Sequence, residues 1–299
     1  MPNGPWKKLA VDFMEIPGGY HLLVATDYYS RQNIIKNTSK LNAVRFYAEN
    51  MLSFWRMYDA DLVGSSLEEI IEHGKEIGWT FTNEDCMLAE EVTRDQSSDP
   101  LWYKLRFGRI TASCFGRSVK TRINSPSMTL IKYICEGNTS QEFPATLYGK
   151  RNEHKVIAAA VELFKFQQHQ DFCSRKSGLI VNPIYPYFAA FPDHIFQCSC
   201  CGTVVVEAKC PFKFENFNRE DGIRSLITRQ KPYIIRDMDR SIKMNHKHEY
   251  YFQVQMKIHL SKASYAFFVI WAPKFTLFIK VRKHEIFWKI NSEKASKFF

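Results

Sequence analysis

Hydrophobic positions along the chain recur with two different periods. Residues 265–272 form an unbroken apolar run, YAFFVIWA, which is typical of a strand buried on both faces. Residues 274–282 alternate apolar and polar positions between basic residues, and this alternation predicts an edge strand. In residues 145–166, Val156 and Phe164 belong to a stripe at helical spacing, which predicts a helix with one apolar face. The chain therefore combines strands with helices.

The chain is organised around residues 189–212, AAFPDHIFQCSCCGTVVVEAKCPF. The Val-Val-Val run predicts a strand, and Cys-Cys-Gly before it predicts a turn. Alternate residues of a strand share a face, so Glu207 and Lys209 point the same way and Ala208 points into the core. A hairpin through the turn brings Asp193 beside Glu207, which makes a hard-oxygen site for Mg²⁺ or Mn²⁺. The simpler interpretation is a surface hairpin with an ordinary Glu–Lys pair.

The charge of the chain favours a polyanionic partner. The 299 residues carry a formal charge of +10 and are rich in aromatic side chains, a composition that suits a nucleic-acid-binding protein. The alternative is charge that serves solubility alone. Residues 59–99 hold twelve acidic and two basic side chains, whereas residues 261–299 hold eight basic and two acidic ones. The basic surface therefore belongs to the later part of the chain.

Three of the eight cysteines lie together at Cys198, Cys200 and Cys201. Three thiols at a turn are compatible with zinc if a fourth ligand is present. No second Cys-x-x-Cys or His pair follows, so the spacing favours reduced structural thiols over zinc. The candidates for the fourth ligand are Cys173, Cys210 and His194.

The sequence has no signal-peptide pattern at its start and no apolar run of the ~18 residues that a membrane helix needs. We therefore expect an intracellular protein in a reducing compartment, with free thiols and no membrane segment. In a eukaryote we expect it in the nucleus.

Two further segments carry candidate site residues. Arg106 and Arg109 precede a helix start at which Ser113 lies, and a helix N-terminus with two arginines predicts a phosphate pocket. The alternative is a capped helix with solvated arginines. Glu153 lies before the apolar stripe of the next long helix, where it either faces a metal or complements the helix dipole.

The first part of the chain has a separate character. Residues 9–16 and 20–26 predict a hairpin around Pro-Gly-Gly. Residues 5–31 resemble the opening hairpin of the retroelement integrase core, in which Asp12 matches the first metal-binding aspartate. One carboxylate cannot build a two-metal site, so this piece is interpreted as a remnant without activity. The domains predicted are an integrase-like remnant with the following segment, an acidic helical linker and a main domain, at residues 1–50, 51–95 and 96–299.

Five ordered blocks in the main domain resemble the YqaJ-type viral recombinase family, relatives of the lambda-type alkaline exonucleases in the PD-(D/E)XK nuclease superfamily. The blocks are RFGRITAS (106–113), YGKRNEHK (148–155), NPIYPYFAAFPD (182–193), VVVEAKCPF (204–212) and YYFQVQ (250–255). The resemblance implies an α/β (α+β) fold with a mixed central sheet flanked by helices. The central strands expected are residues 179–181, 189–196, 204–209 and 265–271, with a helix around residue 255 beside the sheet.

The resemblance also implies a function. It implies a Mg²⁺- or Mn²⁺-dependent deoxyribonuclease that hydrolyses linear double-stranded DNA from its ends; the alternative is a catalytically impaired DNA-binding relic of a mobile element. Double-stranded DNA ends, a homo-oligomer and a single-strand annealing protein are the implied partners. The implied roles are metal binding by Asp193, Glu207 and the Ala208 carbonyl, activation of water by Lys209, an outer acid at Glu153, a grip on the DNA 5′-phosphate by Arg106 and Ser113, and positioning of Lys209 or the water by Gln255.

The sequence departs from the family pattern around the aspartate. The family usually has Ser-Pro-Asp-Gly, whereas this chain has Phe191 and His194 at the outer positions. Glycine supports a tight turn, so His194 is expected to adopt its backbone conformation at some cost, and Phe191 is expected to crowd the site.

Overall fold

The computed structural model describes residues 9–16, 20–27, 33–38, 40–54, 59–77, 81–136, 143–169 and 171–299. The chain divides into two compact units, Met1–Gly78 and Trp79–Phe299, and each is described by itself. Among the described residues, none of the helices combines the length and the apolar character that crossing a bilayer requires.

The first unit contains a small antiparallel sheet. Its strands β1 (Leu9–Ile16), β2 (Tyr20–Asp27) and β3 (Asn33–Thr38) pair in that order, so the predicted hairpin is confirmed and a third strand is added to it. The side chain of Asp12 lies outside the described residues. Helices α1 (Lys40–Met51) and α2 (Leu67–Ile77) follow, and the Ser66 hydroxyl caps α2 by accepting from the Glu69 N–H at 3.3 Å.

The second unit contains the candidate site. Its helices are α3 (Asn83–Val92), α4 (Pro100–Arg106), α5 (Ala112–Lys120), α6 (Met128–Glu136), α7 (Pro144–Phe166), α8 (Arg219–Thr228), α9 (Glu249–Leu260) and α10 (Glu285–Phe298). Its strands are β4 (Ile110–Thr111), β5 (Cys173–Arg175), β6 (Ile180–Val181), β7 (Phe188–Ala190), β8 (His194–Cys198), β9 (Gly202–Lys209), β10 (Ile234–Arg236), β11 (Ile242–Met244), β12 (Tyr265–Ala272) and β13 (Phe275–Arg282).

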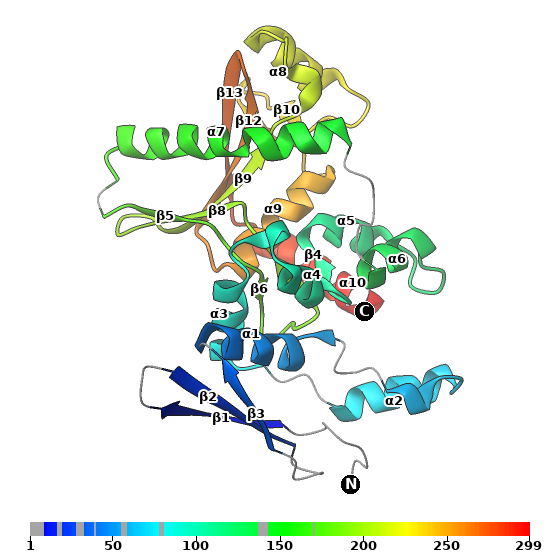
Figure 1. Ribbon diagram of the computed structural model, residues 1–299. Coiled ribbons are helices and arrows are strands. Elements are labelled where there is room, and N and C mark those ends of the chain that lie inside the picture. Colours follow the sequence, from blue (N-terminus) through cyan, green and yellow to red (C-terminus); the bar gives the residue numbers. More distant parts are fainter. Residues whose placement is uncertain are drawn as a thin grey trace. The chain divides into compact units, whose positions relative to one another are not determined.

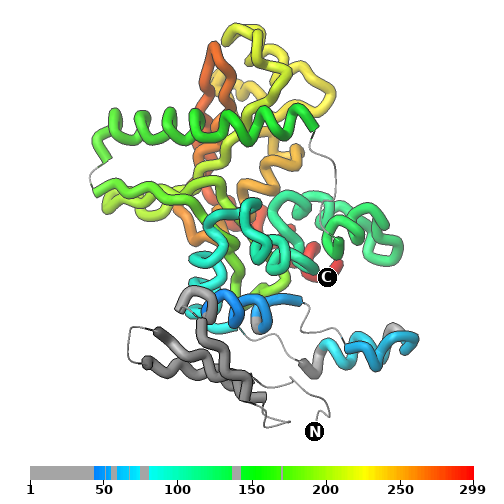
Figure 2. The backbone as a smooth tube through the Cα atoms, viewed as in Figure 1, coloured from blue at the N-terminus to red at the C-terminus, as the bar shows by residue number. Residues whose placement is uncertain are grey.

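A five-stranded mixed sheet forms the centre of this unit, in the order β13-β12-β9-β8-β5. β9 and β12 lie side by side and parallel although more than 50 residues separate them, and the other neighbours are antiparallel (Figures 1 and 2). The apolar run of β12 is buried along nearly its whole length, and β13 is an edge strand, so both predictions are confirmed.

The long helix α7 lies across one face of the sheet (Figure 1). Its fully buried stripe, Val156, Ala160 and Phe164, packs on Val204 and Val206 of β9 and on neighbouring residues of β12. The alternation of strand residues therefore directs the even-numbered positions of β9 toward α7.

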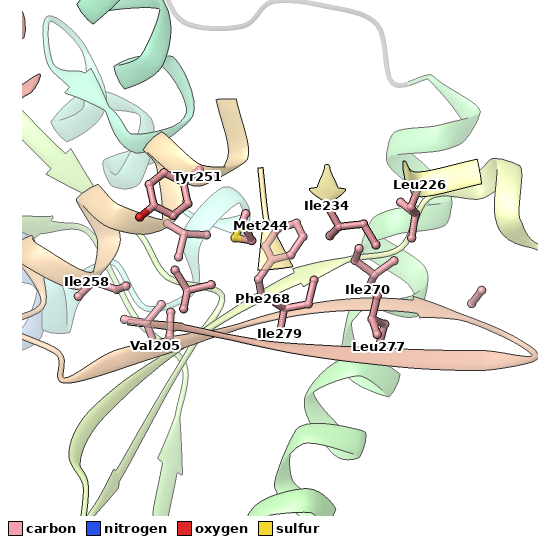
Figure 3. Close-up of a cluster of buried hydrophobic side chains, with 14 of the residues drawn as sticks. Val205, Leu226, Ile234, Met244, Tyr251, Ile258, Phe268, Ile270, Leu277 and Ile279 are labelled. Atoms are coloured by element: carbon pink, nitrogen blue, oxygen red, sulfur yellow. The ribbon is translucent and has the colours of Figure 1, made fainter. Parts of the chain in front are cut away.

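The opposite face of the sheet packs against α9 and α8. Val205, Phe268 and Ile270 point toward this side, where they meet Ile258 of α9 and Leu226 of α8 (Figure 3). Glu207 and Lys209 have the parity of Val205, so the same alternation places them on the side of α9. The register of β9 in the sheet thus decides which helix meets the candidate site residues.

Helix α9 is buried on two sides. Val254 and Ile258 pack on the central sheet, whereas Phe252, Met256 and Leu260 join a second cluster that contains α5 and the small sheet β4-β7-β6. The helix expected around residue 255 is confirmed, and its polar side chains Gln255 and Lys257 are buried, so they need partners within the protein.

Two expectations for the sheet are wrong. Residues 179–181 contribute β6 to the small sheet and not to the central one, and residues 189–196 are split between β7 and β8. Pro192 causes the split, because proline cannot donate to a strand ladder.

The compact units also divide at Gly78, ahead of the boundary expected at residue 95. Helix α3, in the segment expected to be a linker, buries Ala89 and Val92, and its Glu90 binds Arg175 and the Gly178 N–H in the second unit.

Candidate active site

The hairpin of β8 and β9 brings Asp193 and Glu207 together. His194 pairs with Val206, so the next residues outward along the two strands are Asp193 and Glu207. The carboxylate of Asp193 accepts a hydrogen bond from the Ala208 N–H at 2.6 Å. The hairpin expected from the sequence is therefore present, and its register aligns the two acids.

Glu207 is almost fully buried and has several donors around it. The Lys209 ammonium donates to Glu207 Oε1 at 2.6 Å, as the shared strand face predicts. The Gln253 amide of α9 donates to the same oxygen at 2.8 Å. A carboxylate at 1% exposure can keep its charge only with such donors.

Lys257 of α9 is a site residue that the sequence reasoning missed. Its ammonium donates to Glu207 Oε2 and lies 3.6 Å from Asp193 Oδ1, with 1% of the side chain exposed. It is therefore a buried cation between the two acids. The signal for it in the sequence is a lysine within an otherwise apolar helix segment, YYFQVQMKIHL, since a lysine buried there requires an acidic partner.

The pKa values of the two acids move in opposite directions. Burial, followed by the charge of Glu207, raises the pKa of Asp193, although Lys257 and Lys209 oppose the shift. Burial also acts to raise the pKa of Glu207, but Lys209 and Lys257 outweigh it and lower that pKa. Burial alone would lower the pKa of Lys209, but Glu207 raises it, so this lysine stays protonated. Lys209 therefore acts as a positive charge.

Glu153 lies within α7 and not at its start. It is the tenth residue of the helix, beyond the first turn in which a helix dipole acts, so the dipole interpretation is wrong. Burial raises the pKa of Glu153 to about 7, with further contributions from Asp193 and Glu207. The charges of Asp193 and Glu207 therefore act on the Glu153 carboxyl group.

Gln253 contacts the acid site in place of Gln255, the glutamine expected there. The Gln255 amide donates to the Arg282 carbonyl at 2.9 Å and accepts from the His284 N–H at 3.0 Å, which holds the end of β13 against α9. The Gln255 expectation is corrected to Gln253, because residues two apart on a helix point in different directions.

The donor set fits a hard divalent cation. Asp193 and Glu207 offer carboxylate oxygens, the Ala208 carbonyl follows Glu207 in the chain, and Glu153 supplies a third acid nearby. The two lysines show that this cluster already attracts positive charge, since both bind Glu207. Lys257 is the ammonium that lies close to both acids.

A second cluster surrounds Arg106 at the end of α4. Its guanidinium stacks on Trp102 at 4.0 Å and on Phe191 at 4.7 Å from the ring centroids, and its buried Nε has no hydrogen-bond partner among the described residues. Ser113, in the first turn of α5, shares a 3.0 Å hydrogen bond with the Tyr133 hydroxyl, which also neighbours Arg106. Arg106 and Ser113 therefore lie together beside Tyr133, and the phosphate pocket expected here stays a prediction.

Arg109 does not join this pocket. It is 1% exposed, and its guanidinium donates to the Pro186 carbonyl at 2.9 Å and to the Leu105 carbonyl. Burial lowers its pKa to about 9. The prediction that Arg109 grips phosphate is corrected, because its donors are directed to backbone carbonyls in the core.

The two departures from the family pattern have different outcomes. His194 is a regular residue of β8, and its φ is not among the positive values of the described residues, so the expected backbone cost is absent. Phe191 lies with its ring 5.4 Å from the Lys257 ammonium while it also stacks on Arg106. It therefore connects the acid site with the arginine pocket.

Comparison with known proteins matches residues 101–264 to the model of the YqaJ-like viral recombinase domain. The chain belongs to the YqaJ-like viral recombinase domain family. The matched range includes every residue of the acid site and of the Arg106 pocket. The resemblance of residues 5–31 to an integrase core lies outside this range and stays a prediction.

Relatives of this YqaJ-like domain include viral nucleases. The alkaline nuclease of Autographa californica nuclear polyhedrosis virus is 22% identical over 218 residues, which are 68% of this chain and 48% of that protein. The chain therefore spans about half the length of this curated relative.

Two solved structures share the fold. A SOX–DNA complex has a TM-score of 0.52 at 14% identity, covering 87% of this chain and 78% of that one. A KSHV SOX–RNA complex has a TM-score of 0.54 at 12% identity, covering 87% and 85%. The YqaJ-like chain thus shares the α/β fold of these two structures.

Proposed function

We propose that this protein is a divalent-metal-dependent nuclease that hydrolyses linear double-stranded DNA from its ends. The observation that carries the proposal is the adjacent pair of Asp193, which is partly exposed, and the buried Glu207, with Lys209 on the same strand face as Glu207. Family membership and the alkaline nuclease relative support the same reaction class.

In this proposal Asp193, Glu207 and the Ala208 carbonyl hold Mg²⁺ or Mn²⁺. A bound ion supplies a Lewis acid for the phosphate and lowers the pKa of water. Lys209 stays protonated beside Glu207 and stabilises the charge that develops on the phosphate. Gln253 holds the Glu207 carboxylate in position through the 2.8 Å hydrogen bond.

Lys257 keeps the acid pair stable before metal binds. Two adjacent carboxylates repel each other, and Lys257 lies close to both. Its ammonium therefore acts as an internal counter-charge at the two acids that would hold the metal. This residue is a positioning residue, because it contacts the metal-binding acids.

The Arg106 pocket is proposed to receive the terminal phosphate of the DNA strand. The buried Nε of Arg106 has no hydrogen-bond partner among the described residues, and the start of α5 adds backbone N–H groups without a side-chain cap. Tyr133 and Ser113 contribute hydroxyl groups. An arginine with hydroxyl donors suits the phosphate of a 5′ end.

The test is a digestion assay with matched DNA ends. Linear duplexes with 5′-phosphate or 5′-hydroxyl ends are incubated with Mg²⁺, Mn²⁺ or EDTA. We expect loss of duplex only with metal and faster loss from 5′-phosphorylated ends. An Asp193→Asn variant keeps an oxygen for the Ala208 N–H and should fold while losing activity. Degradation that persists in EDTA contradicts the proposal.

One of the two solved structures is a DNA complex and the other is an RNA complex, so single-stranded RNA is included as a substrate in the same assay. RNA cleavage without DNA cleavage would replace the proposed substrate. The DNA-binding relic predicts binding without hydrolysis; the retention of both acids and the lysine in one cluster supports hydrolysis instead. Homo-oligomer formation and an annealing partner stay predictions.

A further inference from the structure

Four side chains that the proposed nuclease does not use converge at the other end of the β8–β9 hairpin. They are His169, Cys198, Cys200 and Cys201, whose ligand atoms all lie within 4.8 Å of one another. The His169 Nδ1 atom lies 3.0 Å from Cys200 Sγ, 3.5 Å from Cys198 Sγ and 3.6 Å from Cys201 Sγ. The sulfur of Cys200 lies 3.4 Å from that of Cys198 and 3.7 Å from that of Cys201.

These separations resemble those of a closed tetrahedral zinc site. Zn–S bonds of about 2.3 Å and Zn–N bonds of about 2.0 Å at tetrahedral angles place two sulfurs about 3.8 Å apart and a sulfur and a nitrogen about 3.6 Å apart. Five of the six separations lie between 3.0 and 3.7 Å, and the sixth, between the sulfurs of Cys198 and Cys201, is at most 4.8 Å, so shifts of no more than about 1 Å enclose an ion.

The histidine is held in the orientation that a ligand needs. Its ring stacks on Phe164 of α7 with centroids 4.4 Å apart. The Nε2 atom lies 3.3 Å from Gln167 Oε1, and a donor at Nε2 leaves the lone pair of Nδ1 directed at the three sulfurs. The preceding residue, Gln168, has a φ of 58°, a left-handed conformation that turns the chain after α7 back toward the hairpin.

The thiols are placed by the strands and not by a loop alone. Cys198 is the last residue of β8, Gly202 begins β9 with a φ of 68°, and Ser264 donates to the Cys201 carbonyl at 2.8 Å. All eight cysteines of the chain are free thiols. The cluster reaches the surface at Cys200, so an ion can enter from solvent.

We propose that His169, Cys198, Cys200 and Cys201 bind one structural Zn²⁺ ion. The three thiol protons leave to solvent as the thiolates bind, and the neutral imidazole binds through Nδ1, so no redox partner is needed. The ion fastens the C-terminal end of α7 to the β8–β9 hairpin. Because α7 carries Glu153 and the hairpin carries Asp193 and Glu207, it also fixes the distance between these acids.

Spacing along the sequence argued against zinc because the fourth ligand, His169, lies far from the cysteines in the chain. Among the described residues, the cluster contains none of the fourth ligands suggested by the sequence, which are Cys173, Cys210 and His194. His169 lies 29 residues before Cys198, and only the packing of α7 on the sheet brings it there. The site is thus Cys₃His, with one ligand contributed by the segment that follows α7.

The experiment measures metal on the full chain, independently of nuclease activity. Purified protein is analysed by mass spectrometry for metals and by zinc X-ray absorption. We expect about one zinc per chain with a shell of three sulfurs and one nitrogen. Replacement by Co²⁺ should give the visible bands of a tetrahedral site together with a thiolate charge-transfer band.

Matched variants assign the ligands. Cys200→Ser and His169→Ala should lose zinc, whereas Cys173→Ser should retain it. His169→Cys should keep zinc and strengthen the charge-transfer band of the cobalt form, because a fourth thiolate replaces the imidazole. An Asp193→Asn variant should retain zinc, which separates this site from the nuclease site.

Three results would overturn the proposal. One is metal-free wild-type protein that rejects Co²⁺ while the thiols of Cys200 and Cys201 react freely. Another is zinc that persists in both Cys200→Ser and His169→Ala. The third is zinc lost in Asp193→Asn but kept in Cys200→Ser, which would place the ion at the acids. The absorption measurement on wild-type protein decides the ligand set even where a variant fails to fold.

Discussion

Replacing Lys257 with methionine tests whether a buried ammonium holds the two acids together. Methionine preserves most of the length and volume of the side chain, so the change removes charge more than packing. Lys257 is 1% exposed and donates to Glu207, and its loss leaves Lys209 as the remaining ammonium at that carboxylate.

The expected loss of stability follows from the burial of the pair. Removing one partner of a buried ion pair costs about 3–5 kcal/mol, because the other charge is left in the core. In a unit of this size, 1 kcal/mol shifts the Tm by about 2–4 °C, so the melting temperature should fall by about 6–20 °C. This figure applies to metal-free protein.

The pH dependence distinguishes charge from packing. Lys209 and Lys257 lower the pKa of Glu207 against the effect of burial, so its stabilising contribution exists above the unfolded pKa and is lost as the pH falls through the folded pKa. The variant should therefore lose most stability at about pH 8 and less at about pH 3, because the contribution of Glu207 to the wild type is lost as the pH falls below the ordinary glutamate pKa of about 4.3.

Thermal unfolding in EDTA and in Mn²⁺ is the assay. Mn²⁺ should restore more stability to Lys257→Met than to the wild type, and it should bind the variant more tightly, because the competing ammonium is gone. Lys289→Met, an exposed lysine on α10, is the control for loss of a positive charge. An equal loss of Tm at both pH values, or no gain in Mn²⁺ affinity, would refute the reasoning.

Three further predictions concern neighbouring residues. In the metal-free wild type, the raised pKa of Glu153 gives stability that is lost as the pH rises from about 4.5 to 7. Glu153→Gln should reduce this loss by at most about 3 kcal/mol, and unfolding in urea at several pH values measures the difference. Gln253→Ala should lower the cleavage rate by about 10- to 100-fold, while Gln255→Ala should lower the Tm instead. Arg106→Ala should weaken binding to 5′-phosphorylated ends by about 10- to 100-fold, with 5′-hydroxyl ends as the control.

Several features of this protein follow from the sequence because they depend on neighbours along the chain. Asp193 and Glu207 lie fourteen positions apart on either side of a turn, so a hairpin alone aligns them. The shared direction of Glu207 and Lys209 follows from the period of a strand. The apolar run of β12 and the alternation of β13 likewise predicted a central and an edge strand.

The local sequence pattern did not predict the surroundings of side chains that take part in tertiary packing. Arg109 and Arg106 are similar in sequence context, yet burial directs one guanidinium to backbone carbonyls and leaves the other stacked on two aromatic rings. Glu153 looked like a residue of a helix start because the stripe after it is so regular, whereas Pro144 begins the helix nine residues earlier.

Only the tertiary structure decided which distant side chains complete each site. Lys257 reaches Glu207 across 50 residues because α9 is buried between two clusters, and His169 reaches Cys198 across 29 residues because α7 packs on the other face of the sheet. Such contacts depend on the register and crossing of elements, which local periods leave open. The hairpin thus supplies the acids and the thiols, and the packing of helices on the two faces of the sheet supplies their partners.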